Sequence, residues 1–213
     1  MTQYGFYFDS SRCTGCRTCE MACKDYKDLS QTVAFRKVYD YEGGKTQLNA
    51  DGTASTDVYA YHVSDACNHC EKPMCFAACP SGAIEKDENG IVFINQDKCN
   101  GAGACVDACP YGVPVMIEET GKADKCDMCR DRIAEGKNPI CVDACPLRAL
   151  EWGDLEELKA KHPDAVSGIA PLADPSETTP SLLINPCPAA KGTDDKTGAI
   201  TNEKSVTGVE AWA

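Results

Sequence analysis

Short apolar and aromatic runs alternate with polar breaks along this chain. Residues 4–8, 33–41 and 57–63 combine aromatic and β-branched residues with partial alternation, which predicts three strands. Residues 45–56 are polar and contain an Asp-Gly turn signal, so we expect a surface hairpin or loop there. Residues 83–94 place an Asn-Gly turn between two apolar runs, a pattern that predicts a β-hairpin.

Helices are expected at two places in the second half of the chain. The insert of residues 130–140 is expected to hold a short helix that ends near Gly136. After a strand at residues 149–152, Asp154 is placed to cap a helix over residues 155–162, because carboxylates fill the first turn. No run of about 18 apolar residues occurs, so no segment is expected to span a membrane.

The composition shifts at Pro171. Residues 171–213 are rich in Pro, Thr, Asp, Lys and Gly, and residues 182–184 (Leu-Leu-Ile) are their only strongly apolar spot. This composition predicts an extended tail, either disordered alone or draped over a partner protein.

Cysteine changes this picture, because 16 of the 213 residues are cysteine and 15 of those fall into four tight groups. Such a count indicates either a disulfide scaffold or a set of metal sites. Thiols two residues apart can share a metal centre, whereas a disulfide between them is strained and closes a tiny loop. The spacing therefore favours metal sites. The groups are Cys13, Cys16, Cys19 and Cys23 (group one); Cys67, Cys70, Cys75 and Cys79 (group two); Cys99, Cys105 and Cys109 (group three); and Cys126, Cys129, Cys141 and Cys145 (group four).

The spacing within the groups is that of iron–sulfur proteins. Group one reads C-x2-C-x2-C-x3-C, and group three reads C-x2-C-x2-C-x3-C-P except that Ala102 stands in place of its second cysteine. Groups two and four have longer gaps and also end in Cys-Pro. Structural zinc needs four ligands per ion, often as two separated C-x2-C pairs, which groups one to three do not match.

The groups are expected to work in pairs, since in two-cluster ferredoxins the fourth cysteine of a run binds the other cluster. Groups two and three, with the hairpin between them, form a compact ferredoxin-like module over residues 64–117. Groups one and four then pair in an outer module of residues 1–63 and 118–170. The predicted fold is α+β, with one ferredoxin-like module inserted in the other and the tail of residues 171–213 outside both. Pairing of group one with two and of three with four is the alternative.

Crossed ligation assigns a cysteine set to each cluster. Three sets are complete and predict 4Fe-4S clusters, while the fourth has three thiolates and predicts a 3Fe-4S cluster, because an alanine methyl binds no iron. A 4Fe-4S cluster whose fourth iron binds water, hydroxide or a substitute side chain, Asp97 or Cys187, is the alternative. The sets are Cys13, Cys16, Cys19 and Cys145; Cys126, Cys129, Cys141 and Cys23; Cys67, Cys70, Cys75 and Cys109; and Cys99, Cys105 and Cys79 with Ala102 at the missing position.

Charge and motif content narrow the function. The formal net charge of −12 argues against nucleic-acid binding and against direct binding to an anionic membrane. The first eight residues lack the basic and long apolar regions of a secretory signal. No nucleophile–base pair or phosphate loop is present, so we expect a protein that is not an enzyme by itself. Five cations flank cysteines and either offset cluster charge or form surface ion pairs: Arg12, Arg17, Lys98, Lys125 and Arg130.

With these groups placed, the chain resembles the iron–sulfur electron-transfer subunits of anaerobic dimethyl sulfoxide (DMSO) reductase complexes, within the wider four-cluster subunits of molybdopterin oxidoreductases. The resemblance covers roughly residues 3–185. The sequence segments that carry the resemblance are residues 4–6, 9–16, 22–28, 67–71, 79–83, 139–142 and 144–150. The family's DMSO enzymes usually have a cysteine where Ala102 stands, whereas the related nitrate reductase subunits have another residue there and a 3Fe-4S cluster.

The resemblance implies a role in anaerobic respiration within a heterotrimer. A membrane-anchor subunit oxidises a quinol, a molybdopterin subunit reduces DMSO or a similar acceptor, and this chain carries electrons between them. The cluster at Cys99, Cys105 and Cys79 would face the membrane subunit, and the cluster at Cys13 the catalytic subunit. The chain would lie at the membrane periphery, on the periplasmic face by co-export with the catalytic subunit; the cytoplasmic face is the alternative. A free-standing polyferredoxin, or the same subunit of another molybdopterin oxidoreductase, is the alternative.

Overall fold

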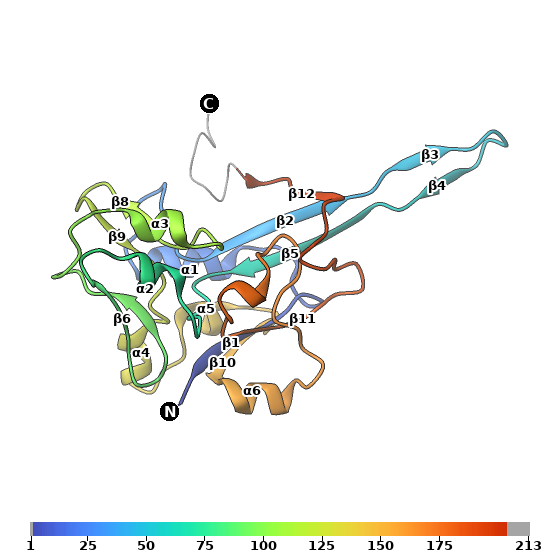
Figure 1. Cartoon of the computed structure of the whole chain (residues 1–213). Helices are drawn as coiled ribbons and strands as arrows, with labels where there is room; N and C mark the ends of the chain where they lie inside the picture. The colour runs from blue at the N-terminus through green and yellow to red at the C-terminus, as the bar shows by residue number, and fades with distance from the viewer. Residues whose placement is uncertain (1, 204–213) are drawn as a thin grey trace.

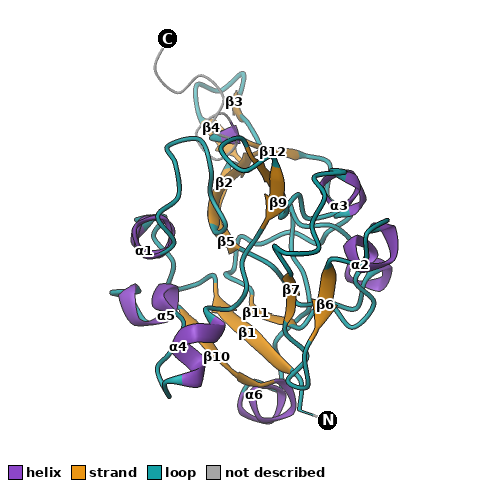
Figure 2. Ribbon diagram, turned by 90° about the vertical axis from the view of Figure 1, so that its left-hand side faces the viewer, coloured by secondary structure: helices purple, strands orange, loops and turns teal. Residues whose placement is uncertain are grey.

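The sheet at the base of the molecule joins strands from both ends of the chain. The computed structural model describes residues 2–203. Strand β1 (Tyr4–Asp9) lies between β10 (Leu150–Asp154), which is antiparallel to it, and β11 (Leu182–Asn185), which is parallel. Figure 2 shows this sheet in the lower half of the view. The expected α+β class, built of small sheets and short helices, is confirmed.

A second sheet extends into a long arm. Strand β2 (Lys37–Gly43) pairs along its length with β5 (Tyr59–Asp65), and β12 (Gly198–Ile200) adds to its other edge. Beyond them, β3 (Thr46–Leu48) and β4 (Ala54–Thr56) form a hairpin that projects far from the body (Figure 1). The polar stretch expected as a hairpin or loop is therefore a hairpin.

The strand expected at residues 33–41 begins only at Lys37. The ammonium of Lys24 binds the backbone carbonyls of Ser30 and Val33, at 2.9 and 2.5 Å, and so holds this segment in a turn. The side chains of residues 33–36 still point inward and are buried.

Two small hairpins frame the middle of the chain. Strands β6 (Ile84–Lys86) and β7 (Val92–Ile94) form the hairpin expected over residues 83–94. Strands β8 (Val115–Ile117) and β9 (Lys122–Asp124) form a second one, which the apolar pattern did not predict.

Four short helices carry cysteines and pack in two pairs on opposite sides of the body. Helix α1 (Thr18–Tyr26) packs against α5 (Ile140–Ala144), and α2 (Met74–Ala78) packs against α3 (Ala104–Ala108). Figure 2 shows the first pair at one side and the second pair at the other. Helix α4 (Arg130–Ala134) occupies the insert of group four, and it ends two residues before the expected Gly136.

Helix α6 (Leu155–Lys161) has the predicted cap. One carboxylate oxygen of Asp154 accepts hydrogen bonds from the backbone N–H groups of Glu156 and Glu157, at 2.9 and 3.2 Å. Such a cap satisfies amides that have no partner within the helix.

The tail is packed on the body over its described part, residues 171–203. It contains a short 3-10 helix, η1 (Pro175–Glu177), and then strand β11, whose Leu182, Leu183 and Ile184 are buried. The apolar spot expected to dock on a partner therefore pairs with β1 of its own chain. The sequence pattern could not show this, because the edge of β1 that receives the segment lies more than 170 residues away. Residues 204–213 lie outside the described part.

We expect Ile184→Ala to lower the free energy of unfolding by about 2–5 kcal/mol, because Ile184 is 0% exposed and its removal leaves a cavity. Leu48→Ala, at a residue that is 85% exposed in the arm, should change it by less than about 0.5 kcal/mol. Thermal unfolding followed by circular dichroism measures both. Equal effects would contradict a structural role for the tail.

Candidate metal centres

All 16 cysteines are free thiols, and the structure gathers 15 of them into four sets. Each set combines cysteines from two of the sequence groups, in the crossed pairing of group one with four and of group two with three. We call them set one (Cys13, Cys16, Cys19, Cys145), set two (Cys23, Cys126, Cys129, Cys141), set three (Cys67, Cys70, Cys75, Cys109) and set four (Cys79, Cys99, Cys105).

The loop of set one is shaped by left-handed backbone. Gly15 has φ 67° and Arg17 has φ 58°, so the chain turns tightly between its first three cysteines. Gly15 needs to be glycine, since a Cβ there would lie 2.6 Å from the His62 ring. The four thiols line one cavity together with the buried Phe8. Cys16 is its exposed member.

Set two lies deeper, since all four of its cysteines are buried. Met128 and Cys129 both adopt positive φ, at 60° and 54°, and so fold the group-four loop back on itself. Met128 is fully buried beneath this loop.

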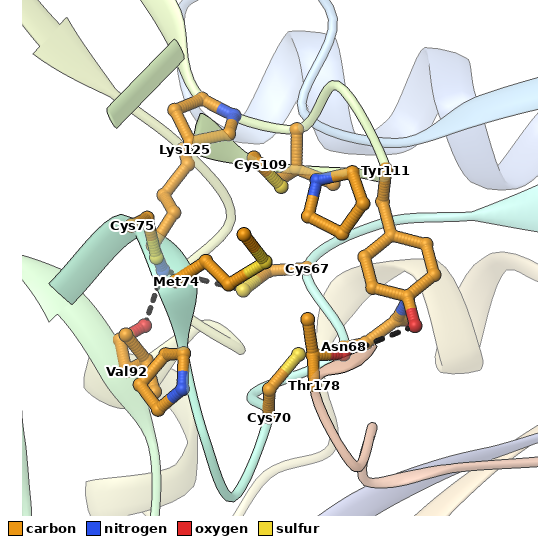
Figure 3. Close-up of a pocket in the computed structure, with 14 residues that line it drawn as sticks. Cys67, Asn68, Cys70, Met74, Cys75, Val92, Cys109, Tyr111, Lys125 and Thr178 are labelled. Carbon is orange, nitrogen blue, oxygen red and sulfur yellow. Dashed lines mark hydrogen bonds between the residues drawn. The ribbon is translucent and has the colours of Figure 1, made fainter. Parts of the chain in front are cut away.

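Set three surrounds a cavity (Figure 3). The cavity walls also include Lys125, Val92 and Tyr111, and Tyr111 exchanges a 3.1 Å hydrogen bond with Thr178 of the tail. In Figure 3 the Lys125 side chain runs along one side of the cavity, and its ammonium donates to the sulfur of Cys67.

Set four lies nearer the surface, and Ala102 takes the place of a fourth thiol. Cys79 and Cys99 are half-buried, Cys105 is buried and Ala102 is exposed. Gly101 and Gly103 flank Ala102 with φ 76° and 72°. These glycines allow the tight turn of the other cysteine loops, so this loop has their general shape without the second sulfur.

Each helix of a pair serves two sets. Helix α1 carries Cys19 for set one and Cys23 for set two, while α5 carries Cys141 for set two and is followed by Cys145 for set one. The other pair is built in the same way. Helix α2 carries Cys75 for set three and is followed by Cys79 for set four, and α3 carries Cys105 for set four and is followed by Cys109 for set three.

Two buried cations lie among these sets. Lys125 is one of the five flanking cations considered above, and it is 2% exposed. The other four form ion pairs at or near the surface, with Asp9, Asp40, Glu85 and Asp87. Burial alone would lower the pKa of Lys125, but the charges of Cys67 and Cys126 raise it. Its ammonium therefore stays positive between sets two and three.

Arg36 is a buried cation that the sequence analysis missed. It is 3% exposed, and its Nη1 donates to Ser64 O and Ser64 Oγ, at 3.4 and 3.1 Å. Two of its nitrogens, Nε and Nη2, have no hydrogen-bond partner. Burial works against its charge, yet the thiols of Cys141 and Cys19 raise its pKa. The available signal was an arginine within an otherwise apolar run, Val33-Ala34-Phe35.

The two alternative ligands for set four lie in different surroundings. Cys187 packs against the main core, where its charge acts on Tyr61, whereas the thiols that act on Cys105 of set four are those of Cys79 and Cys99. Asp97 is exposed in the turn before Cys99. The structure thus brings no Cys187 thiol into set four.

The chemistry of the sets fits a cationic metal centre. Burial raises the pKa of Cys13 to about 11 and those of Cys70, Cys75 and Cys129 to about 12. Metal ligands must be thiolates, and a bound metal deprotonates a coordinating thiol outright. Buried thiols that face one another in fours therefore call for a positive centre among them. Iron–sulfur clusters are held by such four-cysteine sets.

A single ion suits these sets less well than a cluster. Within residues 2–203, no three His, Cys, Asp or Glu side chains converge closely enough to hold one metal ion. The cysteines instead stand around a space, as in set three, where each could bind a different iron. In the same part of the chain, no helix is long and apolar enough to cross a membrane.

Comparison with known families defines the class of the protein. Residues 58–155 match the model of a 4Fe-4S dicluster domain, and residues 4–25 match that of a 4Fe-4S binding domain. The fold and the cysteine sets thus belong to an iron–sulfur protein of ferredoxin-like type, and iron–sulfur clusters are its cofactors.

Similarity to curated proteins identifies the family. The sequence is 51% identical over 205 residues to the B subunit of the anaerobic dimethyl sulfoxide reductase of Escherichia coli (strain K12), covering 96% of this chain and 99% of the relative. It is 40% identical to the thiosulfate reductase electron transfer subunit of Salmonella typhi, covering 73% and 78%, and 36% identical to the B subunit of the polysulfide reductase of Wolinella succinogenes, covering 86% and 94%. The protein therefore belongs to the family of anaerobic dimethyl sulfoxide reductase B subunits. It is a non-catalytic electron-transfer subunit of an oxidoreductase complex.

Proposed function

We propose that this chain passes electrons through four iron–sulfur clusters, from a quinol-oxidising membrane subunit to a molybdopterin subunit that reduces DMSO or a similar acceptor. The observation that carries the proposal is the gathering of 15 cysteines into four sets within a chain that matches its relative over 96% of its length. When bound, the clusters supply one-electron acceptors and donors; the protein holds them in order and tunes their potentials.

The cluster content follows from the sets. Sets one, two and three each offer four thiolates and would hold 4Fe-4S clusters. Set four offers three, because Ala102 has no sulfur, and would hold a 3Fe-4S cluster. Cys187 acts on Tyr61, while the thiols that act on Cys105 are Cys79 and Cys99, which supports an open corner rather than a cysteine from the tail at this site.

The order of the clusters follows from the elements that join the sets. The α1–α5 pair joins set one to set two, and the α2–α3 pair joins set three to set four. Lys125 lies between set two and set three, in contact with residues of both. These contacts support a single row of sets, from four through three and two to one. This row supports electron entry at set four and exit at set one, each at an end of the row of clusters.

The experiment is purification of this chain, with an affinity tag, from membranes of cells grown anaerobically with DMSO. We expect it to bring down a large molybdenum-containing subunit and a membrane subunit, and the complex to reduce DMSO with a quinol donor. A brown protein that purifies alone and exchanges electrons with several soluble enzymes would overturn the proposal in favour of a free-standing polyferredoxin.

A further inference from the structure

Two buried polar side chains, Lys125 and His69, lie at the junction between sets two and three. Each is a sequence neighbour of the cysteines of one set and lies near a cysteine of the other set. Lys125 precedes Cys126 of set two, and its Nζ lies 3.4 Å from the sulfur of Cys67 in set three. His69 lies between Cys67 and Cys70 of set three, and its buried Nε2 has no hydrogen-bond partner, while the charge of Cys126 of set two acts on its ring. Both side chains are buried, at 2% and 0% exposure.

One residue of strand β7 fixes both groups. The backbone N–H of Val92 donates to His69 Nδ1 at 3.0 Å, and the carbonyl of the same residue accepts from Lys125 Nζ. Lys125 Nζ also donates to the carbonyl of Cys126 at 3.0 Å. Figure 3 shows how the Lys125 side chain lies between Val92 and Cys67.

These contacts define the protonation of the imidazole. Because Nδ1 accepts the Val92 N–H, the hydrogen of a neutral ring must be on Nε2. Nε2 is buried and no atom meets the full geometry of a hydrogen bond to it. The charge of the Cys126 sulfur acts on this ring, so this sulfur, as a thiolate bound to iron, would be an acceptor for the partnerless Nε2–H.

We propose that Lys125 and His69 form a reciprocal bridge between the clusters of sets two and three, in which each donates toward a cysteine sulfur of the other group and raises the potential of that cluster. The proposal rests on the ligand sets of the proposed function. A reduced cluster carries one more negative charge than an oxidised one, so a nearby donor or cation stabilises the reduced state. Hydrogen bonds to sulfur and local charge are known determinants of cluster potential.

Lys125 and His69 are thus positioning and tuning residues for the middle step of electron transfer, and they act through ligand sulfurs. The ammonium contacts Cys67 of set three and the carbonyl of Cys126 of set two, so its charge bears on both clusters. The imidazole is acted on by Cys126 and so bears chiefly on set two. The two substitutions should therefore differ in how many clusters they affect.

The test is a potentiometric titration followed by EPR on the anaerobically purified complex. Lys125→Met should lower two of the four midpoint potentials, with about a tenfold smaller reduction equilibrium constant at set three, or about 59 mV for a one-electron couple. Lys125→Arg keeps the charge, so it should move each of these two midpoint potentials by less than a third of that shift. His69→Asn should lower one potential only; asparagine tolerates the positive φ of 41° at this position but is too short to reach both Val92 and Cys126.

The matched control is Lys72→Met, which removes the same charge at an exposed position two residues after Cys70. We expect no shift there. Unchanged potentials in Lys125→Met and His69→Asn, with iron content intact, would overturn the bridge alone. A wild-type complex without four clusters would overturn the proposed function instead. If Lys125→Met does not assemble, His69→Asn decides: one lowered potential supports the bridge, and none contradicts it.

Discussion

Cys145→Ala is expected to abolish the cluster of set one, together with electron transfer from quinol to the catalytic subunit. Cys145 lies in group four of the sequence, but the structure places it with Cys13, Cys16 and Cys19. Changes beside a metal site already cost about 10–100-fold in affinity or activity, so loss of a ligand should cost at least about 100-fold. EPR of the reduced complex should lack the set-one signal and retain that of set two.

Cys187→Ala is the control for this substitution. It removes a thiol of the same chain that belongs to none of the four sets, and we expect all clusters and full activity to remain. Loss of the set-two cluster in Cys145→Ala, with set one intact, would contradict the crossed pairing, because it would show that group four supplies a whole cluster by itself.

Ala102→Cys is expected to complete set four and convert a 3Fe-4S cluster into a 4Fe-4S cluster. The position is exposed and its turn is already shaped by Gly101 and Gly103, so the added sulfur meets no backbone obstacle. Iron should rise by one atom per chain, and the oxidised-state EPR signal of a three-iron cluster should disappear. The potential of this site should fall by on the order of 100 mV, because cluster type is one of its determinants.

Ala104→Cys serves as the comparison, since it adds a thiol in the same loop region at a position that the cysteine spacing does not use. It should leave both the iron content and the three-iron signal as they are. If Ala102→Cys gains no iron, or if the wild-type protein already holds four irons at this site, an open corner at Ala102 is wrong.

The cysteine spacing was sufficient to predict the class of site, since three thiols within seven residues have few other uses. Local patterns were also sufficient to predict the strands β1 and β10, the hairpin β6–β7 and the Asp154 cap. The crossed pairing of the cysteine groups could be predicted only because groups one and four each lack a partner next to them in the sequence. No local sequence pattern indicates which distant helix lies beside α1.

Long-range packing explains what the sequence did not predict. The tail segment Leu182–Asn185 is short and apolar, and its partner edge on β1 is at the other end of the chain. Arg36 lies in a run that reads as a strand, and only folding places it beside the thiols of Cys19 and Cys141. The role of His69 likewise depends on Val92, which is 23 residues away.

The proposed row of four sets would allow the potentials of different clusters to be tuned independently. In the proposed arrangement, two helix pairs of the same design would each hold two clusters, and one buried junction would join them. The cluster potentials can then be set separately at two places. One is set four near the surface, where Ala102 replaces a fourth thiol, and the other is the junction of sets two and three, where Lys125 and His69 lie. The long arm of β3 and β4 stands apart from this row (Figure 1).

The decisive measurement is EPR of the anaerobically purified complex, first oxidised and then reduced stepwise, with iron counted per chain. The account predicts a narrow three-iron signal in the oxidised state that integrates to one spin per chain, followed on reduction by signals of three interacting 4Fe-4S clusters. A protein without iron, or one whose reduced spectrum shows only two clusters, would contradict a four-cluster electron-transfer subunit.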